Sequence, residues 1–390
     1  MHRRAFLTSL AASTTLVAGR AWSAGGDAPR LLTIFLRGGY DALSLIVPTG
    51  SDFYYQARPN ISIARPDHAD PNAAIALDGD WGLHPALKDS ILPLWQSQQI
   101  AFVPFAGTDD LTRSHFETQD TIEMGQPLGG RRNYRSGFLA RMAAQMGGPR
   151  PVAFTVQPPL AFQGGPAVPN VAVITAGQPA LDAHQTDLIS RMYRDHALAG
   201  PIGEGFKVRE RAYRSIAADL ARSTPSAFDL AMRRVGQMLR EDYNLAFLDV
   251  GGWDTHVNQG AATGVLADRA RQFGRGLTAL IDQLGAQVWA ETTIVVVSEF
   301  GRTFRENGDK GTDHGHGSVY WVLGGSIKGG RMVGPQVQLT SASLNQARDL
   351  PVLTDYRTLI GHVAGRMFGL SAAKLDTVFP HAPQVDLGLA

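Results

Sequence analysis

The sequence contains no cysteine among its 390 residues. Without cysteine the chain can form no disulfide, no zinc–thiolate site and no cysteine nucleophile. The ligands of any bound metal must therefore come from histidine, aspartate, glutamate or hydroxyl groups. Such ligands suit harder or borderline divalent ions: zinc, manganese, magnesium or calcium.

An excess of one charge and a long apolar run are also missing. Charged residues make up 18% of the chain, and the formal net charge is +1. No block of like charge indicates a nucleic-acid partner or a membrane surface. No stretch approaches the roughly 18 apolar residues of a membrane span. We therefore expect neither nucleic acid nor a membrane span, and the 44% hydrophobic content allows a sizeable core.

The first 24 residues have the layout of a signal peptide. Arg3 and Arg4 precede a mild apolar run at 10–18, and the small residues at 21–24 suit cleavage. The segment resembles a twin-arginine signal, and an ordinary Sec signal is the alternative. Removal of residues 1–24 takes away three arginines and no acid, which changes the net charge from +1 to −2. The layout predicts a periplasmic or secreted protein.

Short apolar runs alternate with helical patterns along the rest of the chain. Strands are predicted at 31–36, 100–105, 245–250, 293–297 and 319–323. Helices are predicted at 85–95, 114–124, 205–242 and 263–284. Residues 157–205 are richer in Pro, Gly and polar residues, which indicates an insertion or cap. The alternation predicts an α/β fold, a three-layer α/β/α sandwich with a mainly parallel central sheet, in one domain over 28–385.

Polar residues directly follow four of the predicted strands. They are Asp41, Ser114, Asp254, His256 and Glu299. Ligands of parallel sheets bind beyond the carboxyl ends of the strands. We therefore expect these side chains to converge in one cleft.

The same residues have the chemistry of a metal site. Asp254 and His256 are two residues apart, so in extended backbone their side chains point to one side. Buried carboxylates are costly unless they are paired or bound to a cation. The pattern predicts one or two divalent ions held by Asp41, Asp254, His256, Glu299, His314 and His316. Each residue alone also has a simpler interpretation, such as a turn cap, an ion pair with Arg302 or an exposed imidazole.

Five segments of the chain resemble the family called domain of unknown function 1501. They lie at 37–41, 114–116, 252–256, 298–303 and 311–317. The strings Ser-Glu-Phe-Gly-Arg at 298–302 and Thr-Asp-His-Gly-His at 312–316 are the most specific. The resemblance covers about 30–380. That family is similar to the alkaline-phosphatase-like superfamily of phosphatases, sulfatases and phosphomutases, so the resemblance implies an alkaline-phosphatase-like fold.

The resemblance also implies roles for single residues. Ser114 would be the nucleophile at a helix N-terminus, where free amides favour an oxyanion; the alternative is that Ser114 is only a helix N-cap. The acids and histidines named above would hold the ions that activate it. Arg302, Arg37 or Arg113 would orient the oxygens of a phosphate or sulfate group.

Two functions compete on this basis. The first is an exported metal-dependent hydrolase of phosphate or sulfate esters, small or polymeric, with a serine nucleophile. The second is a non-catalytic exported protein of the same fold that binds metal or acts in surface assembly. Only the first needs Ser114 close to the metal ligands. No Gly-x-Ser-x-Gly elbow surrounds Ser114, which argues against a Ser-His-Asp esterase.

Overall fold

The computed structural model describes residues 28–129, 131–173, 189–194, 199–200, 203 and 226–389. The expected signal peptide at 1–24 lies outside these residues. So do part of the expected insertion at 157–205, including 174–188, and the start of the expected helix at 205–242. Within the described part of the chain, no helix is long and apolar enough to cross a membrane.

Eight strands form one sheet in the order β10-β5-β9-β8-β1-β7-β6, with β11 beside β5. Their bounds are β1 Arg30–Leu36, β5 Ile100–Gly107, β6 Pro151–Phe154, β7 Leu245–Val250, β8 Thr292–Val297, β9 Ser318–Gly324, β10 Arg331–Met332 and β11 Thr354–Asp355. All neighbours pair in parallel except β9, which is antiparallel to β5 and β8. The expected α/β fold with a mainly parallel sheet is confirmed, and each expected strand lies within an observed one.

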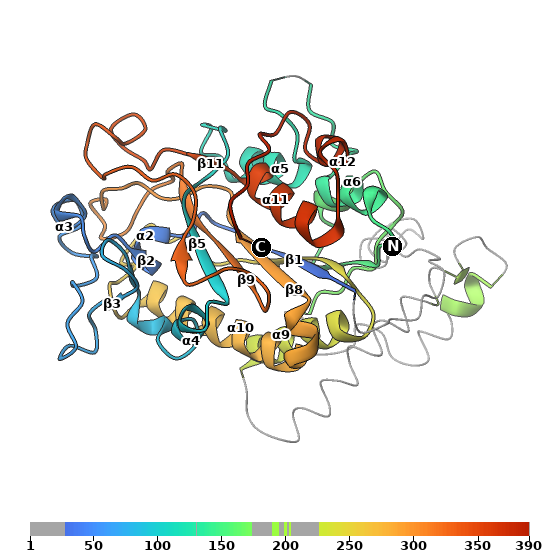
Figure 1. Cartoon of the computed structure of the whole chain (residues 1–390), viewed down its shortest axis with the longest axis horizontal. Coiled ribbons are helices and arrows are strands. Elements are labelled where there is room, and N and C mark those ends of the chain that lie inside the picture. The colour runs from blue at the N-terminus through green and yellow to red at the C-terminus, as the bar shows by residue number, and fades with distance from the viewer. Residues whose placement is uncertain are drawn as a thin grey trace, which may run out of the picture.

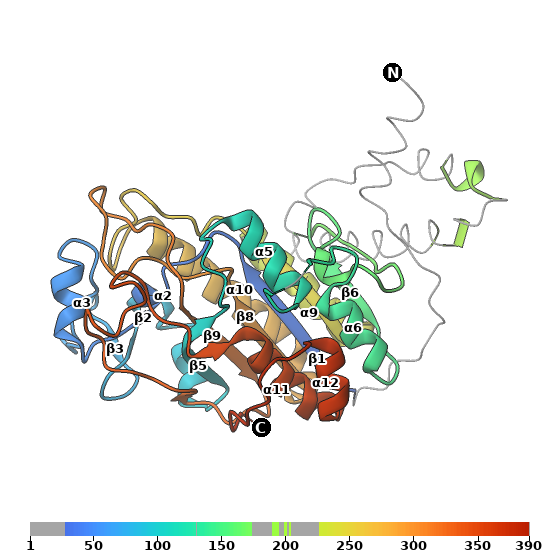
Figure 2. The same cartoon turned by 90° about the horizontal axis from the view of Figure 1, so that it is seen from above.

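The longer helices cover both faces of this sheet. They are α5 His115–Met124, α6 Phe138–Gln145, α9 Ala227–Glu241, α10 Val265–Ala290, α11 Tyr356–Phe368 and α12 Ala372–Val378. Figures 1 and 2 show α9 and α10 on one side of the sheet and α5, α6, α11 and α12 on the other. Shorter elements are α2 Ala42–Leu45, α3 Asp52–Ala57, α4 Leu92–Gln96, and the 3-10 helices η1 Pro85–Leu87 and η2 Leu160–Phe162. A small sheet joins β2 Ile46–Val47, β4 Gly82–Leu83 and β3 Ile75–Ala76.

Successive residues of the central strands enter two different apolar clusters. In β1, Leu32 and Ile34 pack with the residues of α9 and α10, whereas Leu31 and Phe35 pack with those of α6 and α11. A strand buried on both faces needs apolar side chains at nearly every position. This explains why the sequence shows continuous apolar runs rather than an alternating pattern.

Two of the expected helices differ from the observed ones. The helix expected at 85–95 is wrong as a single element, because the chain forms η1 and then α4. Pro93 has no N–H to donate to an earlier carbonyl, so it is tolerated only in the first turn of a new helix. The helix expected at 263–284 is observed as α10, in which Gly285 takes a non-helical φ of 73° directly after the expected end.

The carboxyl ends of β1, β5, β7 and β8 meet at one edge of the sheet. Because β5 and β8 are both antiparallel to β9, they run parallel to each other, and β8 is parallel to β1. The loops that carry the expected site residues therefore leave the sheet from the same edge. This is the arrangement that the sequence predicted for a shared site.

Candidate functional site

Asp254 lies at the centre of a cluster of imidazoles at this edge. Its Oδ1 is 2.9 Å from His256 Nε2 and 3.2 Å from His314 Nε2. Its Oδ2 is 3.4 Å from His115 Nε2. Ligand atoms of His115, Asp254 and His314 all lie within 4.8 Å of one another, close enough to share one metal ion.

The Nδ1 atom of each imidazole has its own anchor. The partners are Glu299 Oε1 at 2.8 Å for His115, Asp313 Oδ1 at 3.3 Å for His256, and the Arg113 carbonyl at 2.9 Å for His314. Carboxylates and carbonyls only accept, so each Nδ1 carries a proton, and in the neutral imidazole Nε2 then presents a lone pair. Metal-bound histidines in proteins are held in this way.

When both imidazoles are neutral, two of these nitrogens face each other without a proton between them. His256 Nε2 and His314 Nε2 are 3.1 Å apart, and two lone pairs at this distance repel unless a cation lies between them. His115 Nε2 is buried and makes no hydrogen bond within the described residues. His115, His314 and Asp254 thus offer two imidazoles and one carboxylate to one ion, and zinc favours both kinds of ligand. The residues present therefore fit a divalent ion.

Arg302 ties the strand-end loops to Asp254. Its side chain is fully buried and donates to Asp254 Oδ1. Its other acceptors are His256 Nε2 at 3.5 Å and the carbonyls of Gly38, Gly39, Trp253 and Thr312. Burial alone would raise the pKa of Asp254, but the hydrogen bond and charge of Arg302 lower it. Arg302 thus keeps Asp254 ionised, and the expected contact of Arg302 with a substrate oxygen stays a prediction.

Glu299 contacts His115 at Nδ1, the ring nitrogen that does not face Asp254. Its side chain is fully buried at the end of β8, and Oε1 accepts from His115 Nδ1, from the Gly38 amide at 2.8 Å and from Gln119 Nε2 at 2.9 Å. Burial would raise the pKa of Glu299, but these hydrogen bonds lower it. The structure places Glu299 as an anchor of His115 and outside the group of possible ligands.

Asp41 belongs to a separate buried cluster. Its side chain is 1% exposed, and Oδ2 lies 2.7 Å from Arg58 Nη1. Ser44 Oγ and Gln259 Nε2 donate to the same oxygen at 2.7 Å. Burial would raise the pKa of Asp41, but the Arg58 guanidinium lowers it. The expected ligand Asp41 is thus matched by an arginine, and the described residues offer one group of possible ligands rather than two.

His316 does not join the Asp254 cluster. It is buried, which lowers the pKa of its imidazole, and the charges that act on it come from Asp349, Arg113 and Asp109. Of the two expected histidines, only His314 reaches Asp254. Gly315 between them packs on the backbone of Arg302, where a Cβ would lie 2.4 Å from the Arg302 carbonyl carbon.

Ser114 begins α5 directly before His115. Ser114 occupies the N-cap position of α5, but its hydroxyl makes no hydrogen bond that caps the helix. Arg113 before it has a φ of +53°, which is strained for a residue other than glycine and typical of functional sites. The Arg113 carbonyl is the acceptor of His314 Nδ1. Arg113 therefore connects Ser114, the next residue in the chain, to His314 of the imidazole cluster through its carbonyl.

The other two arginines considered for substrate binding are occupied by acids. Arg37 pairs with Glu123 at 2.7 Å and Asp249 at 2.8 Å. Arg113 pairs with Asp349 at 2.7 Å. Both guanidinium groups support the loops around the site in this arrangement.

The sequence did not select His115 as a site residue, because a single histidine next to Ser114 is weak evidence on its own. Its position carried a usable indication. His115 is the first residue of a helix that follows a buried strand, and such a residue faces the carboxyl edge of the sheet. Two polar residues in a row at this point, here Ser114 and His115, therefore predict that one or both belong to the site.

The anchoring role of Glu299 predicts an effect on metal affinity. Glu299→Ala should weaken zinc binding by about 10- to 100-fold, because His115 loses the acceptor that fixes its ring. Glu299→Gln should lose less, since the amide oxygen still accepts from His115. Competition titration with a zinc chelator measures the change, with Glu117→Ala on the exposed side of α5 as control. Unchanged affinity in Glu299→Ala would contradict the role.

Two solved structures are similar to the chain at low sequence identity. A protein in the alkaline phosphatase superfamily from Vibrio parahaemolyticus is 11% identical, with a TM-score of 0.38 over 85% of this chain and 71% of that chain. Ps i-CgsB in complex with k-i-k-neocarrahexaose is 11% identical, with a TM-score of 0.39 over 93% and 75%. No curated protein matches the chain. Residues 28–379 match the family described as protein of unknown function (DUF1501), and the chain belongs to that family.

Proposed function

We propose that this protein is a divalent-metal-dependent hydrolase of phosphate or sulfate esters that acts outside the cytoplasm. The observation that carries the proposal is the Asp254 carboxylate faced by the Nε2 atoms of three histidines with anchored Nδ1 atoms. Asp254, His115, His256 and His314 would hold the ion. A divalent ion bound there supplies Lewis-acid polarisation of an ester oxygen.

The residues of α5 supply the remaining parts of such a reaction. The Ser114 hydroxyl is not used as a helix cap, so it is available as a nucleophile. The first amides of α5 are suited to an anionic oxygen of the ester. Attack by Ser114 Oγ on phosphorus or sulfur would form a serine ester and release the alcohol with the serine proton. Water then cleaves the serine ester and restores the hydroxyl.

A second function is favoured by a different observation. Glu299 and Asp41, two of the expected ligands, are paired with His115 and Arg58 instead. One group of metal ligands is sufficient for a protein that binds a metal ion but catalyses no reaction. Under this alternative Ser114 has no chemical role.

Substitution of Ser114 separates the two functions. Ser114→Ala should retain one equivalent of metal and lose turnover by at least about a thousandfold, because the covalent route disappears. A panel of phosphate and sulfate esters with added zinc, manganese, magnesium or calcium measures the turnover. Ser97→Ala, at an exposed serine, is the control. A wild-type protein that binds metal but cleaves no ester supports the metal-binding alternative.

Export is the part of the proposal that rests on residues 1–24. We expect the mature protein to begin between residues 21 and 25, as mass spectrometry of exported material can measure. Replacement of Arg3 and Arg4 by lysine should keep the protein in the cytoplasm if the twin-arginine route is used. Continued export of that variant would indicate the Sec route, and retention of Met1 in exported protein would contradict cleavage.

A further inference from the structure

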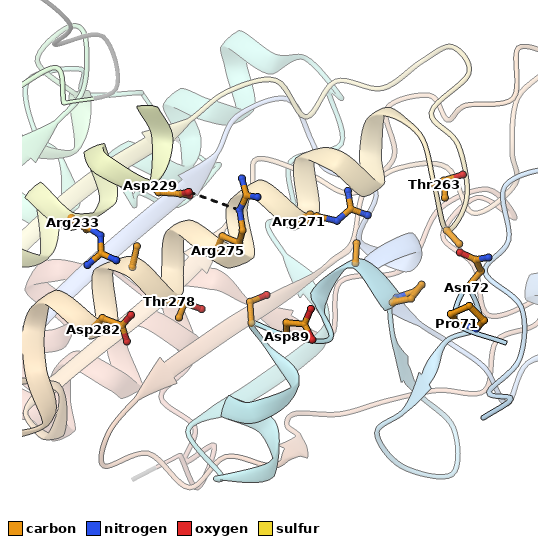
Figure 3. Close-up of a pocket in the computed structure, with 15 residues that line it drawn as sticks. Pro71, Asn72, Asp89, Asp229, Arg233, Thr263, Arg271, Arg275, Thr278 and Asp282 are labelled. Carbon is orange, nitrogen blue, oxygen red and sulfur yellow. Dashed lines mark ion pairs between the residues drawn. The ribbon is translucent and has the colours of Figure 1, made fainter. Parts of the chain in front are cut away.

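A pocket of about 560 Å³ is lined by residues of α9, α10 and the segment 85–90, and by the loops at 71–72 and 262–263, none of which carries the imidazole cluster. Figure 3 shows it as an elongated site, with Arg233 and Asp282 toward one end and Asn72 and Thr263 toward the other. Its volume falls in the range of small-molecule sites, about 300–1,000 Å³. None of the residues that line it belongs to the candidate metal centre.

A cation without a partner lines this pocket. Arg233 on α9 is half-buried and has no hydrogen bond or ion pair in the described part of the chain. A partly desolvated guanidinium without a counter-charge is unfavourable, so the position is suited to an anionic ligand group. Arg275 on α10 also lines the pocket, where it forms an ion pair with Asp229 at 3.9 Å.

Acceptors without a donor line the same pocket. Asp229 Oδ1 is buried and makes no hydrogen bond within the described residues, while Oδ2 accepts from the Ser226 amide. Asp89 and Asp282 add two exposed carboxylates with no partner in that part of the chain. A bare anion would leave these acceptors unpaired and would be repelled by them. The ligand must therefore bring hydrogen-bond donors together with its acidic group.

The neutral lining decides between the kinds of donor. The amide of Asn72 and the hydroxyl of Thr263 can pair with ligand hydroxyls in either direction. The hydroxyls of Ser90 and Thr278 donate to backbone carbonyls, so they accept from a ligand. None of the residues described at the pocket is aromatic, so nothing there stacks on a nucleobase. We propose that this pocket binds a small hydroxylated acid, such as a sugar acid or a sugar phosphate. The acid group lies on Arg233 and the hydroxyls on the carboxylates. This goes beyond the proposed ester hydrolysis and does not depend on it.

Binding of glucuronate and glucose 6-phosphate to the full mature protein tests the proposal. Titration calorimetry should detect both ligands at millimolar concentration or below. Arg233→Ala should weaken each by about tenfold or more, the loss of one charge-assisted hydrogen bond. Arg240→Ala, which removes an exposed arginine from the same helix, should bind as the wild type does. Asp254→Ala should also retain binding, because it alters only the candidate metal centre.

Three further probes separate the parts of the ligand. Glucose should bind more weakly than glucuronate, and glycine and inorganic phosphate should bind more weakly still. Equal binding of inorganic phosphate would overturn the hydroxyl requirement, and equal binding of glycine would point to a zwitterion instead. Wild-type affinity in Arg233→Ala, or no binding of either acidic sugar, would overturn the site. Thermal unfolding of Arg233→Ala establishes that it is folded before its affinity is compared.

Discussion

Asp254→Ala should remove the bound metal. The wild-type protein is expected to bind one equivalent of zinc, and the variant should lose at least about a hundredfold in affinity. The reason is that Asp254 is the only carboxylate that the described imidazoles share. Substitution of residues that merely orient ligands already costs about 10- to 100-fold, so loss of a ligand should cost at least as much. Elemental analysis after dialysis and a competition titration measure the result.

Two variants calibrate this experiment. Asp309→Ala removes an exposed acid from the loop near Asp313 and should bind zinc as the wild type does. Asp313→Ala removes the anchor of His256 Nδ1 and the acceptor of Asn307 Nδ2 but no ligand, so its effect should be intermediate. If Asp254→Ala still holds an equivalent of zinc at wild-type affinity, the metal centre lies elsewhere.

Arg58→Met should destabilise the fold by about 3–5 kcal/mol. Arg58 is fully buried and donates to Asp41, and it also donates to the carbonyls of Thr303 and Phe304. Removal of one member of a buried ion pair leaves the other charge uncompensated, which has this cost in proteins. Urea unfolding monitored by circular dichroism measures the difference in the free energy of unfolding.

Arg65→Met is the matched control, because Arg65 pairs with Asp52 on the surface and such pairs contribute about 0–1 kcal/mol. The pH dependence gives an independent check. Since Arg58 lowers the folded-state pKa of Asp41, the wild type should have this contribution above about pH 4 and lose it as the pH falls through the folded pKa. Without Arg58, burial raises that pKa, so the deficit of the variant should shrink as the pH falls. A deficit that is the same at every pH would contradict the assignment to Asp41.

The sheet was largely predictable from the sequence because its central strands are buried on both faces. Continuous apolar runs such as Thr293 to Val297 have no competing interpretation at that length once helices flank them. The helix at 85–95 was not predictable by periodicity, since Pro93 divides a pattern that otherwise fits. The carboxyl ends of β5 and β8 lie at the same edge of the sheet because the strand between them, β9, is antiparallel to both. No sequence pattern encodes that direction of β9.

The candidate site was predicted in part. Asp254, His256 and His314 converge as expected, because they follow strands or lie in a loop that returns to the same edge. Asp41 and Glu299 were expected as ligands because they also follow strands. Each has a closer partner instead. Arg58 lies in an irregular segment, and His115 was set aside because a lone histidine is weak evidence for a site. A strand end places a carboxylate at the right edge, but its partner depends on side chains from distant segments.

The position of β1 at the middle of the sheet has a consequence for synthesis. β1 pairs with β7 and β8, and β8 begins more than 250 residues after β1 ends. At a translation rate of about 5–20 residues per second, β1 has no second neighbour for roughly 13–50 s. A nascent chain that ends before Leu245 contains β1, β5 and β6, none of which pairs with another of the three. Unpaired strands of this kind are prone to aggregation, so we expect the nascent chain to need holding factors until its second half has been made.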